Sequence, residues 1–315
     1  MGAYAIRRIL LLFPTVILAG TLCFFLLRIL PGDIVTALNS DGGARPADIE
    51  KLREELGFND PVIVQYGEWL WGALRGDLGY SVYRDMEVED LLLDKLETTL
   101  TMAILAMSVS LLVAIPTGII SAVKRGSRTD ELIRIFSGIA LAAPPFWVGM
   151  IVIWFVSVYI GWSPPIFYEP FYEDPIRNLT LMAFPVLSIS LSSAAIISRL
   201  MRSMMLEVLY QDYVRTARAK GLMEYNVVIK HAARNAMIPV LTMCGFHFGS
   251  ILGGVVVVEQ VFNLPGLGRM LLLAVIARDV QMILGIVLAL TVILSIWILI
   301  IDLLYAVVDP RIRYN

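Results

Sequence analysis

The residue types that most often carry chemistry are scarce in this sequence of 315 residues. It has only two histidines, His231 and His247, and they are 16 positions apart, so neither a His-Glu-x-x-His site nor another histidine-based metal cluster is expected. The phosphate-binding pattern Gly-x-x-x-x-Gly-Lys-Ser/Thr is also missing, so the chain is not expected to bind ATP by that route. We therefore predict no catalytic residue, no metal site and no bound cofactor.

One segment, residues 207–222, does carry a pattern suited to an interaction. It reads Glu-Val-Leu-Tyr-Gln-Asp-Tyr-Val-Arg-Thr-Ala-Arg-Ala-Lys-Gly-Leu. Small and basic residues alternate here, and Gly221 permits the sharp turn that ends a short helix. A basic helix with a small-residue face suits insertion into a groove of another protein. From these residues alone, a solvated basic loop explains the pattern equally well.

The elements that must position this segment are indicated by the distribution of charge. Charged residues make up 17% of the chain, against about 25% in soluble domains, and hydrophobic residues make up 58%. A bilayer-spanning helix needs roughly 20 apolar residues, so stretches without Asp, Glu, Lys or Arg predict spans. There are six such stretches: 9–27, 98–123, 135–168, 178–198, 235–258 and 280–301. We predict six transmembrane helices, the third of which is kinked near Pro144-Pro145 and followed by an extended exit.

Lysine and arginine indicate the side of the membrane that each loop faces, because positively charged short loops stay in the cytoplasm. If the six spans alternate, one side receives 15 of these residues and the short segments of the other side receive 3. Both termini and the loop 199–234 are therefore expected in the cytoplasm. The long segment 28–97 is expected outside, and it has a net charge of −8.

Segment 28–97 is not a bare linker. Residues 46–57 have the apolar spacing of a short amphipathic helix that stops at Gly57. Residues 62–74, which include Tyr66, Trp69 and Trp71, look like a second helix lying at the membrane interface. Together they predict an external helical cap, whose role is either to pack on the ends of the spans or to contact a solute.

Residues around the basic segment carry a family resemblance. Residues 213–221 and 231–240 closely resemble the coupling-loop signature of permease subunits of the dipeptide, oligopeptide and nickel class of ABC importers. Arg215-Thr216-Ala217 stands where importers in general have Glu-Ala-Ala, so this is an EAA-like loop. Further motifs follow in family order along essentially the full chain: 30–33, 74–79, 97–100, 124–126, 144–147, 258–269 and 309–313.

The resemblance implies an all-α polytopic membrane protein with the type I ABC importer permease fold, located in a prokaryotic inner or plasma membrane. Its expected parts are a cytoplasmic N-terminus with the first span (1–30), an extracytoplasmic helical segment (31–97), a five-helix core (98–308) containing a cytoplasmic coupling loop (201–235), and a cytoplasmic tail (309–315). The chain itself is expected to be non-catalytic, with ATP and Mg²⁺ bound only by partner subunits.

The same resemblance implies the partners and the sites. The partners are a second homologous permease, two cytoplasmic ABC ATPase subunits, an extracytoplasmic solute-binding protein and the lipid membrane, without nucleic acid. The residues expected to couple to an ATPase are Glu207, Asp212, Tyr213, Arg215, Thr216, Ala217, Arg218, Ala219, Lys220 and Gly221. The residues expected to face the binding protein or solute are Glu259, Phe262, Asn263, Pro265, Gly266, Gly268 and Arg269. A plain turn between the fifth and sixth spans explains this second set equally well.

Two other classes of protein explain the sequence less well. A secondary transporter or channel without an ATPase partner is disfavoured, because no Asp, Glu, Lys or Arg interrupts a predicted span, so paired carboxylates for a proton relay are not visible. A membrane-embedded enzyme would need a catalytic constellation inside the spans, and the sequence has none. Di- or oligopeptides are the expected cargo, while nickel and oligosaccharides stay open as alternatives for chains of this kind.

Overall fold

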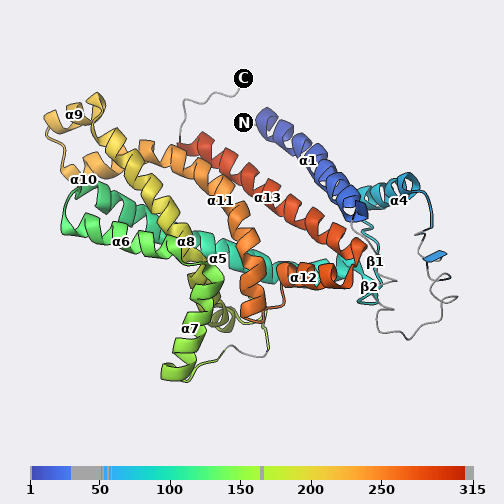
Figure 1. The fold of residues 1–315 in the computed structure, drawn as a ribbon. Helices are drawn as coiled ribbons and strands as arrows, with labels where there is room; N and C mark the ends of the chain where they lie inside the picture. Colours follow the sequence, from blue (N-terminus) through green and yellow to red (C-terminus); the bar gives the residue numbers. More distant parts are fainter. Residues whose placement is uncertain are drawn as a thin grey trace. The chain divides into compact units, whose positions relative to one another are not determined.

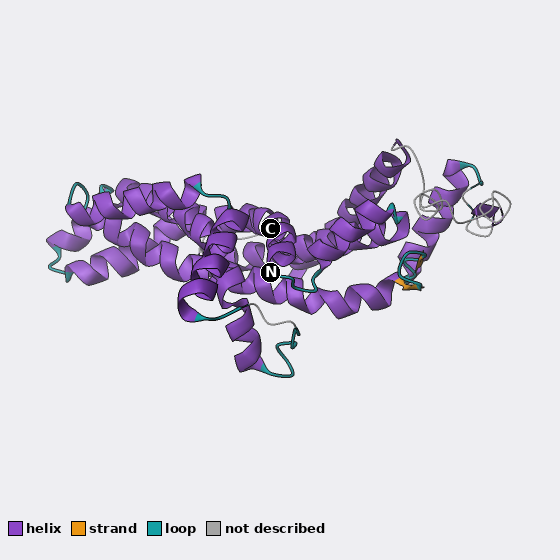
Figure 2. Ribbon diagram, turned by 60° about the horizontal axis from the view of Figure 1, so that its bottom comes forward, coloured by secondary structure: helices purple, strands orange, loops and turns teal. Residues whose placement is uncertain are grey.

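The computed structural model describes residues 2–29, 51, 53–54, 57, 59–163 and 167–308. Most of these residues are helical, as the purple ribbon of Figure 2 shows. In chain order (Figure 1) the helices are α1 (Gly2–Ile29), α4 (Val62–Arg75), α5 (Val88–Val123), α6 (Arg128–Ala142), α7 (Pro145–Ile160), α8 (Pro175–Leu209), α9 (Asp212–Ala219), α10 (Glu224–Asn226), the π-helical η1 (Val227–Ala233), α11 (Arg234–Val261), α12 (Leu267–Ala277) and α13 (Val280–Val308). Strands β1 (Tyr80–Ser81) and β2 (Met86–Glu87) pair antiparallel in a small hairpin, with Tyr80 opposite Glu87.

Among the described residues, five helices match predicted membrane spans, or six if one bent pair counts as a single span. The helices α1, α5, α8, α11 (with α10 and η1) and α13 are long and apolar enough to cross a membrane, and α6 with α7 makes a sixth span if the bent pair counts as one. The pair is bent by 99°. The bend falls where Pro144, in extended backbone conformation, precedes Pro145 at the start of α7. Proline has no N–H to donate to the preceding turn, and the predicted kink is therefore confirmed.

The chain divides into two compact units, which are described separately here. The first consists of residues 1–5, 99–264 and 296–315, and it contains α6 to α11 together with most of α5 and the end of α13. The second consists of residues 6–98 and 265–295, and it contains most of α1, α4, the hairpin, the start of α5, α12 and the first part of α13.

In the first unit α8 is the central helix, because it packs against α6, α7 and α11. In the most apolar 18-residue stretch of α8, 61% is buried inside the structure, compared with 39% for the span that contains α11. Small residues let α5 approach α8 closely: a Cβ atom added to Gly118 would lie 2.7 Å from Cβ of Met201. Close approach at small residues is typical of membrane helices, whose association depends on tight packing. The placement of α8 matters for function because α9 follows it directly in the chain.

In the second unit two apolar clusters hold the helices together. One cluster joins α1, α4 and α13, and the other joins the start of α5 to α12 and α13. A buried hydrogen bond attaches the hairpin to the residue that precedes α13: Ser81 Oγ donates to Asp279 Oδ2 at 2.5 Å. Asp279 also caps α13, because its Oδ1 accepts the backbone N–H of Met282 at 3.1 Å.

The external segment agrees with the sequence prediction in part. The predicted helix 62–74 is confirmed as α4, whereas the predicted helix 46–57 lies largely outside the described residues. The hairpin was not predicted, because its strands have only two residues each. A further helix, α12, was also missed: the turn expected at 258–269 is shorter, and the chain is helical again from Leu267.

Candidate functional site

The basic segment forms a short helix, α9, which begins three positions after the last residue of α8. Val214 and Ala217 are buried and cluster with Val227 of η1, with Val208 of α8 packed against them. These apolar contacts hold one face of α9 against its neighbours. Acidic Asp212 lies in its first turn and basic Arg218 in its last, an arrangement that complements the helix dipole.

The opposite face of α9 is exposed. The exposed residues of the predicted set are Asp212, Tyr213, Arg215, Thr216, Arg218, Ala219, Lys220 and Gly221. Glu207 is exposed too, but it lies on α8 and not on α9. The predicted turn is present at Gly221, whose φ of +77° is the left-handed conformation that favours glycine. Its N–H donates to the carbonyl of Arg218 at 2.9 Å and closes the end of the helix.

Two side-chain contacts tie α9 to the elements that follow it. Asn235 Nδ2 of α11 donates to the Tyr213 hydroxyl at 2.7 Å. Arg218 Nη2 donates to Glu224 Oε1 at 2.7 Å, and this hydrogen bond to a carboxylate raises the pKa of Arg218. The sequence reasoning missed Glu224 and Asn235 as parts of this site. Asn235 lies in segment 231–240, which carries part of the family resemblance, but nothing in that segment indicates a contact with Tyr213.

The predicted external loop begins in the first unit, where it is mostly buried. Glu259 is fully buried in α11, and its Oε1 accepts a hydrogen bond from Thr99 Oγ1 at 2.6 Å. Phe262 is 2% exposed and packs on α7: a Cβ atom added to Gly149 would lie 2.8 Å from the Phe262 ring. Asn263 is exposed and has a positive φ of +56°, so it forms the tip of the turn.

Of the remaining predicted residues, all of which belong to the second unit, two line a cavity of about 490 Å³. Gly266 and Gly268 are buried at the start of α12, whereas Pro265 and Arg269 line the cavity. The other lining residues come from the hairpin, α5 and α12, and they are Arg84, Met86, Asp90, Leu91, Asp94, Lys95, Met270 and Leu273. Charges of both signs thus meet at this surface, including an ion pair between Lys95 and Asp94.

The hairpin that contributes Arg84 to this cavity is held by its own turn. The Tyr80 hydroxyl donates to Asp85 Oδ1 at 2.5 Å. This hydrogen bond to a carboxylate raises the pKa of Tyr80. Asp85 itself has a positive φ of +56°, and Arg84 N–H donates to Ser81 Oγ at 3.1 Å. These contacts give the hairpin a defined shape although it has only two residue pairs.

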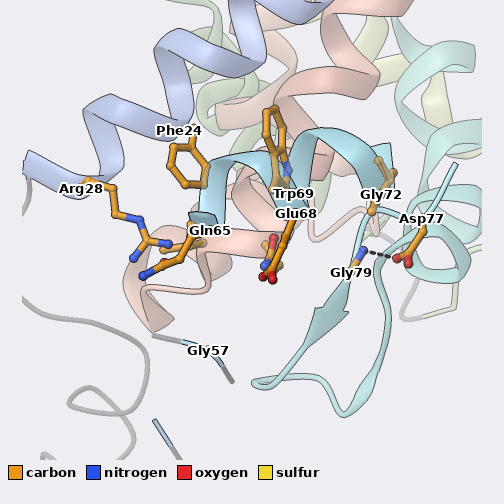
Figure 3. Close-up of a pocket in the computed structure, with 12 residues that line it drawn as sticks. Phe24, Arg28, Gly57, Gln65, Glu68, Trp69, Gly72, Asp77 and Gly79 are labelled. Carbon is orange, nitrogen blue, oxygen red and sulfur yellow. Dashed lines mark hydrogen bonds between the residues drawn. The ribbon is translucent and has the colours of Figure 1, made fainter. Parts of the chain in front are cut away.

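A second, smaller cavity of about 210 Å³ lies in the second unit between α1, α4 and α13 (Figure 3). Phe24 and Trp69 border it, as do Glu68 and Asp77. The hydrogen bond from Gly79 N–H to Asp77 Oδ1, 2.9 Å long, fixes its rim. A polar cavity of this size is suited to ordered water. Among the described residues, no group of three or more His, Cys, Asp or Glu is placed to hold a metal ion.

These observations define a class: a polytopic helical membrane protein with a short exposed helix between two of its spans. The family model described as "Binding-protein-dependent transport system inner membrane component" matches residues 114–314, and the N-terminal model of the same system matches residues 1–103. The chain belongs to this family, and it is a transmembrane permease subunit of an ABC importer.

Similar proteins match over the whole length of the chain. The oligopeptide transport system permease protein AppB of Bacillus subtilis (strain 168) is 40% identical over 320 residues, with 100% of both chains covered. A Brucella abortus (strain 2308) protein, named as a peptide transport system permease protein, is 37% identical over 315 residues with the same coverage.

Two solved structures share the fold. A chain of the MetNI methionine ABC transporter in inward facing conformations is similar with a TM-score of 0.52 and 15% identity, over 70% of this chain and 96% of that one. A chain of an amino acid ABC transporter with histidines is similar with a TM-score of 0.50 and 16% identity, over 69% and 94%. The expected type I permease fold is therefore confirmed.

Proposed function

We propose that this chain pairs with a second homologous permease to form the membrane pathway of an ATP-driven peptide importer. One observation carries the peptide assignment: relatives named for oligopeptide and peptide transport are 40% and 37% identical over their full lengths. In this proposal an extracytoplasmic binding protein delivers di- or oligopeptides, and two cytoplasmic ATPase subunits supply the energy. The chain itself is non-catalytic and binds no cofactor.

The proposed contact with an ATPase subunit is the exposed face of α9. Three features support it: the basic side chains point to solvent, the apolar face is already buried, and Tyr213 and Arg218 are tied to Asn235 and Glu224. A helix held in this way reaches its partner in a preset orientation, so little ordering entropy is lost on binding. Closure of the ATPases around ATP then displaces α9, and the two permeases switch between inward-open and outward-open arrangements.

The proposed contact with the binding protein is the surface around the 490 Å³ cavity. Support comes from its lining, because predicted residues Pro265 and Arg269 meet Arg84 and two carboxylates there. Charges of both signs on a surface orient a partner with complementary charges and speed its association. Of the other predicted residues, Asn263 is exposed, while Glu259, Phe262, Gly266 and Gly268 support the turn from within.

Transport of peptides is tested in proteoliposomes that contain the two permeases and the two ATPase subunits, with the binding protein added outside. We expect ATP-dependent uptake of labelled di- or oligopeptides. Nickel and an oligosaccharide serve as competing cargoes in parallel assays. ATP-dependent uptake of either of these, without uptake of any peptide, would contradict the peptide assignment.

The contact between α9 and an ATPase is tested by cross-linking on a background in which Cys23 and Cys244 are replaced by Ala. Ala219→Cys places a thiol on the exposed end of α9, and Arg125→Cys places one in the other basic loop as the matched control. We expect a cross-link to an ATPase subunit from Ala219→Cys only. Equal cross-linking from both positions, or none from Ala219→Cys, would count against this role of α9.

A further inference from the structure

An ion pair between a buried carboxylate and a partly buried arginine joins helices of the first unit near the end of α8. Asp130 lies in the first turn of α6, with a side chain 3% exposed, and Arg202 lies on α8, with a side chain 21% exposed. Arg202 Nη2 donates to Asp130 Oδ2 at 2.8 Å, and Nε donates to Oδ1 at 2.9 Å. This two-point fork fixes the orientation as well as the distance between the two side chains.

Two further groups complete the arrangement. The Ser121 hydroxyl, on α5, donates to Asp130 Oδ1 at 2.5 Å and accepts a hydrogen bond from Arg202 Nε at 3.0 Å. The backbone N–H of Gly126, in the turn between α5 and α6, donates to Asp130 Oδ2 at 3.0 Å. We call Ser121, Gly126, Asp130 and Arg202 the inner clamp. Through it, one carboxylate connects α5, the following turn, α6 and α8.

The place of the inner clamp along α8 is informative. Arg202 precedes the last residue of α8, Leu209, by seven positions, which is roughly 10 Å along a helix. The helix α9 begins three positions after Leu209. The clamp therefore grips α8 about two turns before the chain enters α9, and it touches none of the residues proposed to meet the ATPase.

Stability alone is a weak explanation for such a pair. Taking two charges out of water costs free energy that their attraction often fails to return, and neutral replacements of a buried ion pair are frequently no less stable. What a neutral pair cannot reproduce is the rigid two-point geometry between helices. The structure of the clamp thus favours a mechanical role over a purely stabilising one.

We propose that Asp130 and Arg202 are positioning residues for transport: the inner clamp makes α8 move as one body with α5 and α6. A displacement of α9 then reaches the membrane pathway instead of being absorbed by bending at the end of α8. This inference rests on the proposed function of α9. It adds residues that lie outside the set proposed to meet the ATPase.

The main test compares variants in the complete reconstituted importer, measuring peptide transported per ATP hydrolysed. The double variant Asp130→Asn with Arg202→Gln removes both charges together, so that no unpaired charge is left buried. We expect this ratio to fall by about fivefold or more, the lower end of typical coupling effects. Arg202→Lys keeps the charge but loses the fork, and we expect it to recover only part of the ratio.

The matched control is Arg199→Gln, which removes an exposed arginine one turn earlier on the same helix. We expect its ratio to stay at the wild-type value. If the double variant reaches the membrane in normal amount and also keeps the wild-type ratio, the inference is overturned. An equal loss in Arg199→Gln would also overturn it, because the effect would then come from general charge on α8.

A second measurement uses the purified chain in nanodiscs and does not involve the ATPases. Spin labels are attached at Ile139→Cys on α6 and Ser203→Cys on α8, both exposed positions, with Cys23 and Cys244 replaced by Ala. We expect the double clamp variant to broaden the distance distribution between the labels, and Arg199→Gln to leave it unchanged. An unchanged distribution in the double variant overturns the clamp. If instead Ala219→Cys fails to cross-link while the distribution broadens, the role of α9 fails and the mechanical role of the clamp stands.

Discussion

Gly221 shows how much one residue decides at the end of α9. Its φ of +77° lies in the left-handed region, where a side chain with a Cβ branch clashes with the backbone. Apart from the two neighbouring residues in the chain, no residue has an atom within 4 Å of the position that a Cβ atom would take, so the constraint is conformational and does not come from packing. The residue can therefore be changed without disturbing neighbouring side chains, which makes it a clean probe of the turn.

We expect Gly221→Val to lower peptide uptake by about tenfold, because the strained turn misplaces α9. The coupling between the ATPases and the permease is then weakened, and tenfold is within the usual range of such effects. Gly221→Asn is the matched variant, since asparagine tolerates the left-handed conformation, and it should keep most of the uptake. Peptide uptake by the assembled importer is measured for both variants, and the amount of each variant in the membrane is determined in parallel. Normal uptake by Gly221→Val would remove the turn from the mechanism.

Phe262 is a residue whose burial the sequence did not indicate. It was predicted to face a binding protein or solute, but it is buried against Gly149. We expect Phe262→Ala to reduce the free energy of unfolding by about 3 kcal/mol, as for other buried aromatic residues. Thermal unfolding of the purified chain in detergent checks this, with Phe246→Ala as the control because Phe246 is 74% exposed. Equal melting temperatures for the two variants would contradict the burial of Phe262.

At the scale of elements, the contact between α5 and α8 leaves no room for a side chain at Gly118. A Cβ atom on Gly118 would lie 2.8 Å from the Ser198 carbonyl as well as 2.7 Å from Met201 Cβ. Backbone at that distance cannot move aside without shifting a whole helix. The Thr117 and Ser198 hydroxyls, 2.9 Å apart, are hydrogen-bonded at the same contact. Helix α8 thus owes its central position to small and hydroxylated residues that were not recognisable as contacts from the sequence.

We expect Gly118→Ala to destabilise the chain by about 1–3 kcal/mol, because it forces α5 and α8 apart. Gly138→Ala on α6 is the matched control, since the nearest atom to its Cβ would be Arg199 Nη2 at 3.9 Å. The control should be neutral or slightly stabilising, because alanine favours helix more than glycine does. Melting temperatures of both variants in the same detergent give the comparison. A stable Gly118→Ala variant would mean that the two helices are less closely packed than described.

At the scale of the whole molecule, charge is sorted along the chain. Short segments on one side of the predicted spans hold 15 Lys and Arg, while segment 28–97 on the other side has a net charge of −8. Positively charged loops stay in the cytoplasm, so this pattern predicts the orientation of every span. The same orientation places α9 where a cytoplasmic ATPase can reach it and places the hairpin outside.

Labelling of single cysteines in whole cells tests this orientation, again with Cys23 and Cys244 replaced by Ala. We expect a membrane-impermeant maleimide to label Tyr83→Cys and Tyr172→Cys from outside, since both positions are exposed. Arg125→Cys and Ala219→Cys should react only after the membrane is permeabilised. Labelling of Ala219→Cys in intact cells would invert the predicted topology and rule out the proposed ATPase contact.

The sequence by itself determined the apolar stretches of the six predicted spans, the bend at Pro144-Pro145 and the turn at Gly221, and it left open whether the basic segment is a helix or a solvated loop. These features depend on local properties: the free-energy cost of charge in lipid, the missing N–H of proline and the backbone freedom of glycine. Helix ends were less accurate, because helices such as α5 and α8 continue beyond the charge-free stretches that predicted them.

Only the tertiary structure decided which polar residues meet. Asp130 and Arg202 are 72 positions apart, Thr99 and Glu259 are 160 apart, and Ser81 and Asp279 are 198 apart. Each pair forms because elements distant in the sequence pack side by side, and a single sequence carries no record of that proximity. The same reason explains Phe262, which the family resemblance placed in a loop that meets a binding protein or solute and which is buried against Gly149 of α7.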